Sequence, residues 1–343
     1  MNYMEAVEHL KQQVEDSVFL IYGEEQYLIE KIVEQIINVK LDKIDVRERL
    51  EHVIRFDLDQ TAIDEVILEV ETYPFLGGDK VVIADQASFL TAKPSKTSIE
   101  HDTNRLINYL NDPVDFSVLI LIAPYEKIDE RKKIAKRLKK SALTICCEEV
   151  KPWHLDKWVE HMIKSYHIVF EHGVQELLIS EAGANLSILE KEIEKLSLNV
   201  GEGGTVTLDI AKNLISHQGN TSGLKLVDTV LTKDLQLAIQ TYKDLLRLNE
   251  EPIALVALLA SQLRVIYQVK LLQKKGYSQK QMAQQLKLHP YVVKMGIERE
   301  RRFSLNYLYY CIGKCAETDQ AIKQGKVEKN LAFELLLYQL INA

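Results

Sequence analysis

The sequence predicts an α/β domain with a parallel sheet, followed by two all-α domains. Three observations support this fold class. In roughly the first 150 residues, short apolar runs alternate with segments of helical spacing. These runs are apolar throughout, as strands buried on both faces are, and helices separate them as in a covered parallel sheet. After Cys147 the strand pattern stops, and helical periodicity continues almost to the last residue.

Five apolar runs are predicted to form the strands of the sheet. The first, SVFLIY, ends directly before Gly23, and KVVIAD and SVLILIA are the third and fourth. Runs of this length bounded by turn residues are typical of buried strands. The predicted strands cover residues 17–22, 52–57, 80–85, 117–123 and 142–147.

The segments between these strands have the spacing of amphipathic helices. Leu28, Ile32 and Ile36 recur every four residues, which places them on one helical face. Similar apolar stripes predict helices over residues 61–72, 102–111 and 127–140. Because parallel strands need crossover connections, these helices are expected to join the strands and to cover the sheet.

Two breaks divide the helical second half. A glycine-rich segment at residues 199–205 separates two helices, and QGNTSG at residues 218–223 has the composition of a linker. Together with the junction at Lys151 and Pro152, these breaks predict domains at residues 1–150, 151–217 and 218–343.

Composition excludes several classes of protein. The 343 residues carry a net charge of −7 and contain 14 Gly and 7 Pro, which excludes collagen and low-complexity chains. The longest apolar runs, residues 118–124 and 252–260, are shorter than a bilayer span, and the polar N-terminus lacks a secretion signal. A cytoplasmic location is therefore expected. Four cysteines without CxxC spacing are predicted to be reduced core residues: Cys146, Cys147, Cys311 and Cys315.

A phosphate-binding loop would be expected after the first strand, but its key residues are missing. That loop requires GxxxxGK followed by Ser or Thr, so that backbone N–H groups, the Lys and the hydroxyl hold phosphate and magnesium. Here Gly23 has no second glycine partner, and Lys31 precedes an isoleucine. Glu24 and Glu25 add two carboxylates that would repel a triphosphate. ATP binding at this degenerate site is therefore not expected.

The third strand ends in Asp85 and Gln86, where a nucleotide hydrolase would hold magnesium and place a general base. Asp85 could hold magnesium, although a role in capping the end of the strand is favoured, and the amide of Gln86 cannot act as a base. The chain has no GxSxG or HExxH motif, and its cluster of four histidines at residues 154–172 has no nearby cysteine. We therefore predict no catalytic residue, no metal site and no cofactor.

Cationic side chains gather in two segments. Residues 131–140 contain seven, with Ile134 and Leu138 spaced to face the sheet; a solvated helix face is favoured, and contact with an acidic partner or phosphate backbone stays open. Residues 264–302 contain ten cations and only two acids, a segregation that is typical of local attraction to nucleic acid. The candidate DNA-contact or partner-contact residues are Lys274, Lys275, Lys287, Lys294, Arg299, Arg301 and Arg302.

Residues 276–293, within the second basic segment, resemble a helix-turn-helix. Ser278 can cap the first helix, Ala283 is the small residue at the helix contact, and Pro290 can open the second helix. Helical hairpins in bundles produce the same spacing. The pattern thus leaves both a DNA-binding helix pair and a packing hairpin open.

An apolar connector precedes the third strand. Pro74 stops the preceding helix, and two glycines then turn the chain toward the strand. Phe75 and Leu76 lie between them, where large apolar side chains are costly if solvated. They could fold back on the core, or they could fill a partner's pocket at little cost in conformational entropy.

Six segments in common order resemble the delta subunit family of bacterial DNA polymerase III, the clamp-opening subunits of clamp loaders. They are VFLIYGEEQYLIEKIV, TYPFLGGDKVVIADQASFL, KIDERKKIAKRLKK, ANLSILEKEIEKLSL, EPIALVALLASQLRVIYQVKLLQKKGYS and TDQAIKQGKVEKNLAFELLLYQL. The resemblance implies an AAA+-like architecture: a RecA-type α/β domain, a helical lid and a helical collar. It also implies a subunit without ATPase activity, and Ser187 stands where the lid's second sensor would place an Arg.

The resemblance also implies a function and a site. The family's clamp-binding pair maps onto Pro74 and Phe75, with Leu76 adjacent; because Pro replaces the usual aliphatic residue, Phe75 and Leu76 are the favoured pair. The implied function is to bind and open the sliding clamp for loading onto DNA. The implied partners are the sliding clamp (the beta subunit), the tau/gamma ATPase and delta-prime subunits, and primed DNA. Two alternatives remain, an active AAA+ ATPase and a helix-turn-helix regulator.

Overall fold

The computed structural model describes the chain except residues 13–14, 75–76, 93–98, 216–219, 248–249 and 302. It divides into two compact units, residues 1–149 and 150–343. The finer division near residue 217 stays a prediction, since that position lies outside the described residues.

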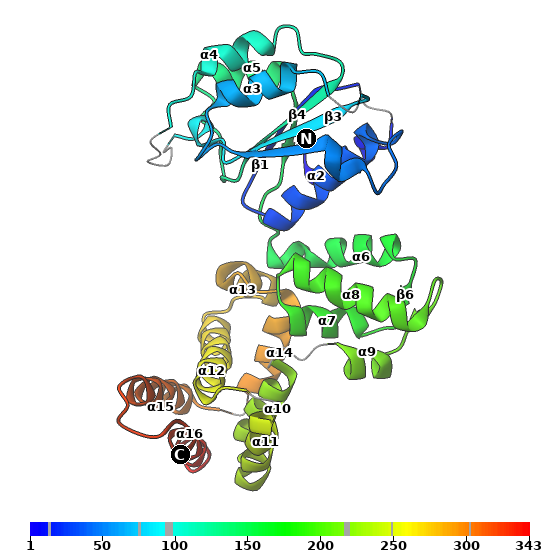
Figure 1. The fold of residues 1–343 in the computed structure, drawn as a ribbon. Coiled ribbons are helices and arrows are strands. Elements are labelled where there is room, and N and C mark those ends of the chain that lie inside the picture. The colour runs from blue at the N-terminus through cyan, green and yellow to red at the C-terminus, as the bar shows by residue number, and fades with distance from the viewer. Residues whose placement is uncertain (13–14, 75–76, 93–98, 216–219, 248–249, 302) are drawn as a thin grey trace. The chain divides into compact units, whose positions relative to one another are not determined.

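The first unit is built on a five-stranded parallel sheet with the strand order β2-β3-β4-β1-β5 (Figure 1). All five predicted strands are present, and every neighbouring pair is parallel. Their bounds are β1 (Val18–Tyr22), β2 (Val53–Asp57), β3 (Lys80–Asp85), β4 (Ser117–Ala123) and β5 (Leu143–Cys146).

Helices cover both faces of this sheet, as the continuous apolar runs predict. On one face, Leu20, Val82 and Leu119 share a buried cluster with α3 (Ile63–Glu71), α4 (Thr103–Tyr109) and α5 (Lys133–Ser141). The intervening strand residues, Phe19 and Ile21 among them, are equally buried and point to the opposite face. Helices α1 (Tyr3–Leu10) and α2 (Gln26–Lys40) pack together there, away from α3, α4 and α5 in Figure 1.

Helix α5 begins at Lys133, later than the predicted start at residue 127. The cause is a turn nucleated by Asp129, whose carboxylate accepts the backbone N–H of Arg131 (3.1 Å) and whose carbonyl accepts that of Lys132 (3.1 Å). Asp side chains compete for backbone N–H groups in this way and favour turns over helix interiors. Ile134 and Leu138 nevertheless face the core, as predicted.

The second unit opens with four helices and one feature that the sequence did not predict. The helices are α6 (Leu155–Ser165), α7 (Val174–Ala182), α8 (Leu186–Val200) and α9 (Leu208–Leu214). Between them, β6 (Val169–Phe170) and β7 (Thr205–Val206) form a parallel pair. Two-residue strands are too short to produce an alternating pattern. The predicted glycine break is confirmed, because α8 ends at Val200 and is capped by Gly201, whose φ is +75°.

The remaining helices form a bundle around α12. Their bounds are α10 (Asn220–Leu231), α11 (Leu235–Arg247), α12 (Pro252–Lys274), α13 (Gln279–Leu286), α14 (Pro290–Glu300), α15 (Leu305–Lys323) and α16 (Lys329–Ile341). Because α10 already begins at Asn220, the predicted linker over residues 218–223 is too long. Asn, Thr and Ser are favoured in the first turn of a helix as well as in linkers, so composition alone could not separate the two.

Helix α12 is the one helix in the described chain that is long and apolar enough to cross a bilayer, although its longest uninterrupted apolar run is short. Leu255, Leu259 and Leu263 of this helix join a buried cluster with α10, α11, α15 and α16. Packing inside this bundle accounts for its hydropathy. Cys311 and Cys315 of α15 are unpaired and buried in the same cluster, as predicted for core cysteines.

Candidate functional site

The connector between α3 and β3, called the tip here (residues 73–79), is anchored by the ion pair of a buried lysine. Lys80, only 3% exposed, begins β3 and points its ammonium at the last turn of α3. There Nζ donates to the Glu69 carboxylate (2.7 Å) and to the Glu69 carbonyl (2.5 Å). The two ends of the tip are therefore held together by a contact in which the Lys80 ammonium is buried and the Glu69 side chain is 32% exposed.

Further contacts order the flanks of the tip. The Tyr73 ring packs against Phe116 with centroids 5.0 Å apart, and His52 Nδ1 donates to the Asp79 carbonyl (3.0 Å). The Gly77 N–H donates to the Pro74 carbonyl (3.0 Å), which closes the turn. Tyr73 is 67% exposed and Pro74 is half-buried. Phe75 and Leu76, the predicted clamp-binding pair, lie outside the described residues.

Replacing Glu69 with alanine is expected to lower the free energy of unfolding by about 2–3 kcal/mol, because the Lys80 ammonium would stay buried without a counter-charge. Urea unfolding followed by circular dichroism measures this. Glu71→Ala is the matched control: Glu71 pairs with Arg105 at the surface, and losing that pair costs below about 1 kcal/mol. If both variants lost equal stability, the burial of the Lys80–Glu69 pair would be refuted. In a Lys80→Met background the effect of Glu69→Ala should shrink.

Two backbone N–H groups after β1, those of Gly23 and Glu25, are already hydrogen-bonded within the protein. The Gly23 N–H donates to the Ala123 carbonyl (3.3 Å), and the Glu25 N–H donates to the Cys147 carbonyl (3.1 Å). Gly23 has φ +136°, and a Cβ there would lie 2.0 Å from the Cys147 carbonyl oxygen. The end of β5 thus occupies the place where phosphate oxygens would approach a nucleotide-binding loop.

The two charged residues of the degenerate nucleotide site also have partners within the protein. Lys31 lies one turn inside α2 and holds its Nζ 5.7 Å from the centroid of the Tyr27 ring. Asp85 forms an ion pair with Arg55 of the neighbouring strand (2.5 Å), so its carboxylate joins β2 to β3 instead of capping a turn. Within the described residues, no group of three or more His, Cys, Asp or Glu is placed to hold a metal ion.

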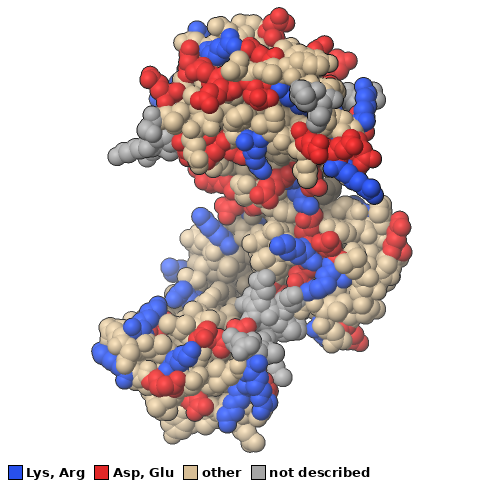
Figure 2. Space-filling model, in the orientation of Figure 1, with Lys and Arg blue, Asp and Glu red and all other residues tan. Residues whose placement is uncertain are grey.

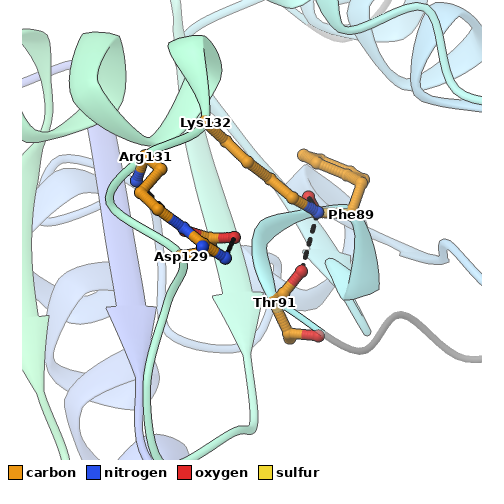
Figure 3. Close-up of polar contacts among 5 residues, drawn as sticks. All are labelled: Phe89, Thr91, Asp129, Arg131 and Lys132. Atoms are coloured by element: carbon orange, nitrogen blue, oxygen red, sulfur yellow. Dashed lines mark hydrogen bonds and ion pairs between the residues drawn. The ribbon is translucent and has the colours of Figure 1, made fainter.

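Several cations of the basic segment at residues 131–140 form hydrogen bonds and ion pairs within their own unit. Figure 3 shows Lys132 reaching across to the carbonyls of Phe89 (2.8 Å) and Thr91 (2.7 Å). In the same view the Arg131 guanidinium donates to Asp129 and lowers the pKa of that carboxyl to about 2. Arg137 and Lys139 are likewise hydrogen-bonded within the unit. These contacts favour a structural role for the segment.

Most candidate cations of the second basic segment are exposed. Figure 2 shows one face on which Lys and Arg are scattered over the second unit, whereas Asp and Glu are dense on the first. The exposed candidates are Lys274, Lys275, Lys287, Lys294 and Arg301. Arg299 instead pairs with Asp228 (2.8 Å) and has a side chain that is 18% exposed. Arg302 lies outside the described residues.

The helix-turn-helix geometry is present but does not expose a reading helix. Ser278 caps α13 in a capping box with Gln281, Ala283 is buried against α14, and Pro290 opens α14. A helix that reads the major groove presents exposed side chains near its N-terminus. Here Tyr291 is half-buried and Val293 is fully buried. Helices α13 and α14 therefore form a hairpin that packs against α12.

Comparison with solved structures gives the class of the protein. The DNA clamp loader delta protein of Bacillus subtilis superposes with a TM-score of 0.72 and 33% sequence identity, covering 99% of this chain and 100% of that one. This chain therefore shares the architecture of that clamp-loader protein, a covered parallel sheet followed by a helical C-terminal region.

Sequence comparisons give the family. Two delta-subunit family profiles match: DNA polymerase III, delta subunit, at residues 19–148, and the C-terminal domain of that subunit at residues 220–340. DNA polymerase III subunit delta of Bacillus subtilis is 34% identical over 94% of this chain and 92% of its own length. A probable subunit delta of Aquifex aeolicus is 25% identical over 76% and 73%. The chain belongs to the DNA polymerase III delta subunit family and is a clamp-loader component of DNA replication.

Sequence reasoning missed the anchors of the tip. A lysine at the start of the apolar run KVVIAD was a weak signal, because a cation in a buried strand needs a partner. No sequence pattern indicates that Tyr73, next to Pro74, makes an aromatic contact. Its aromatic partner, Phe116, is distant in sequence, so only the fold brings the two rings together.

Proposed function

We propose that this chain binds the ring-shaped sliding clamp through the tip and favours an opened ring during loading onto primed DNA. Phe75 and Leu76 would enter an apolar pocket of the clamp, with Pro74 setting the direction of the turn. The observation that supports this most is the neck, the two contacts at the flanks of the tip: Lys80 with Glu69 and Tyr73 with Phe116. Flanks that are already ordered reduce the entropy lost on binding.

Apolar burial would supply the energy of opening. Fully burying a Phe and a Leu side chain is worth roughly 3–6 kcal/mol in total. Only the part of this that differs between the closed and the opened clamp shifts the equilibrium between them. The proposed partners that regulate this step are the tau/gamma ATPase and delta-prime subunits of the loader, in the cytoplasm.

We propose no catalytic role and no cofactor for the chain itself. The occupied N–H groups of Gly23 and Glu25 and the pairing of Asp85 with Arg55 argue against ATP binding. ATP hydrolysis is assigned to the partner subunits. The exposed cations Lys274, Lys275, Lys287, Lys294 and Arg301, together with Arg302, are proposed to meet DNA or a neighbouring subunit, whereas Arg299 is proposed to stabilise α14 through Asp228.

The test is a calorimetric titration of the isolated chain with the sliding clamp from the same organism. We expect binding without nucleotide and no change in affinity on adding ATP with magnesium. Direct titration of the chain with ATP should give no heat of binding. Clamp binding that requires ATP, or measurable ATP binding by the chain, would instead favour the active ATPase. Sequence-specific duplex binding with a symmetric footprint would favour the helix-turn-helix regulator.

A further inference from the structure

A cavity of about 600 Å³ opens in the second unit, between the segment before α6 and the helix pair α13–α14. Its walls come from positions more than a hundred residues apart, so no local sequence pattern marks it. Its principal lining residues are Trp153, His154, Gln279, Lys280, Gln284 and Pro290.

Hydrogen bonds fix the walls of this cavity relative to each other. The backbone N–H of Tyr291 donates to Nδ1 of His289 (3.2 Å), which leaves Nε2 to donate to the Asp156 carboxylate (3.4 Å). His289 precedes α14 and Asp156 lies in α6, so this contact ties the two walls together. The Gln279 amide also donates to the Pro290 carbonyl (2.9 Å) and joins α13 to α14. The cavity is therefore a built feature of the unit.

The chemistry of the lining is aromatic and cationic. Trp153 is half-buried, so part of its indole is accessible, and the Lys151 ammonium lies 5.9 Å from the centroid of its ring. Lys280 is exposed on α13, and exposed Lys287 follows directly after the end of that helix, as its left-handed C-cap residue. An aromatic platform with cations spaced along a groove is the arrangement that binds single-stranded nucleic acid by base stacking and phosphate attraction.

We infer that this cavity receives an unpaired base of single-stranded DNA, with Trp153 as the stacking surface and Lys151 and Lys280 as phosphate contacts. A duplex is disfavoured, because its bases are stacked on each other and would have to leave the helix to enter a concave site. Single-stranded DNA is favoured over a peptide by the local charge, since Lys280 lines the cavity and Lys151 lies against Trp153, whereas the described lining contains no Asp or Glu. This inference does not rest on clamp binding by the tip.

Intrinsic fluorescence tests the stacking directly. The chain has two tryptophans, so Trp158→Phe leaves Trp153 as the only one. The probe is an oligothymidylate of about 12 nucleotides, within the usual range of single-strand site sizes, at low salt. We expect its binding to quench Trp153 emission. An abasic chain of equal length, which keeps the phosphates and removes the bases, should quench little. Equal quenching by both chains, or none by the oligothymidylate, would overturn the inference.

A second experiment measures binding affinity by the fluorescence anisotropy of a labelled oligothymidylate. The wild-type chain is compared with single variants. Trp153→Ala should weaken binding roughly tenfold, and Trp153→Phe should retain most of it because a ring remains. Lys280→Ala should weaken binding and lower the salt dependence by about one counterion-release step. The charge-matched control is Lys243→Ala, at an exposed position of α11 outside the cavity. If Trp153→Ala bound as tightly as the control, or if duplex DNA bound in preference, the assignment would be wrong.

Discussion

Alanine at both Phe75 and Leu76 is expected to weaken binding of the chain to the sliding clamp on the order of a thousandfold. Truncation of a central aromatic or aliphatic anchor costs about 2–4 kcal/mol where the side chain is fully buried in a partner's pocket. Two adjacent anchors removed together would lose most of the affinity that the tip supplies. Calorimetric or surface-based titration of wild type and variant with the same clamp measures the change.

Two controls make this result specific to the tip. Leu198→Ala removes an exposed apolar side chain (81% exposed) from the second unit, and it should leave clamp affinity unchanged. The urea midpoint of the double variant should match that of wild type, since the neck contacts of Lys80 and Tyr73 do not involve the replaced residues. Undiminished clamp binding by a folded double variant would remove Phe75 and Leu76 from the site. Exposed Tyr73 would then be the next position to replace.

The fold of the first unit could be predicted because each strand is apolar throughout. Burial on both faces removes polar residues from the run, and this leaves a pattern that needs no tertiary information. Features that depend on one local hydrogen bond or on two residues were not predicted. Because of the turn at Asp129, α5 begins later in the sequence than expected, and the β6–β7 pair is too short to produce an alternating pattern.

The same distinction, between features with a local sequence pattern and features that depend on the fold, applies to the candidate sites. Missing glycine and hydroxyl residues after β1 were visible in the sequence, and so was an apolar connector with Phe75 and Leu76. The partners of Lys80 and the cavity at Trp153 were not visible, because both depend on residues brought together by the chain's path. Charge counts located the basic segment but could not tell Arg299, which pairs with Asp228, from exposed Lys294.

Gly23→Ala is expected to lower the free energy of unfolding by about 4 kcal/mol, in the range of the most damaging single substitutions. The added Cβ would lie 2.0 Å from the Cys147 carbonyl oxygen, and the backbone φ of +136° is one that side-chain-bearing residues rarely adopt. The obstacle is backbone rather than a flexible side chain, so β1 or β5 must move. Urea unfolding with an unchanged denaturant slope measures the loss.

Gly77→Ala is the control that separates two effects in Gly23→Ala: the clash of the added Cβ with the Cys147 carbonyl and the cost of a positive φ. Gly77 also has a positive φ (+72°), but apart from its chain neighbours no atom of the described residues lies within 4 Å of the position its Cβ would take, so the expected cost is only about 1 kcal/mol. Equal losses in the two variants would mean that β5 does not press against the turn after β1. The Cys147 carbonyl would then no longer hold the Glu25 N–H, and the argument against nucleotide binding would rest on the missing P-loop residues alone. A larger loss at Gly23 would mean that the backbone, as well as the sequence, excludes a triphosphate.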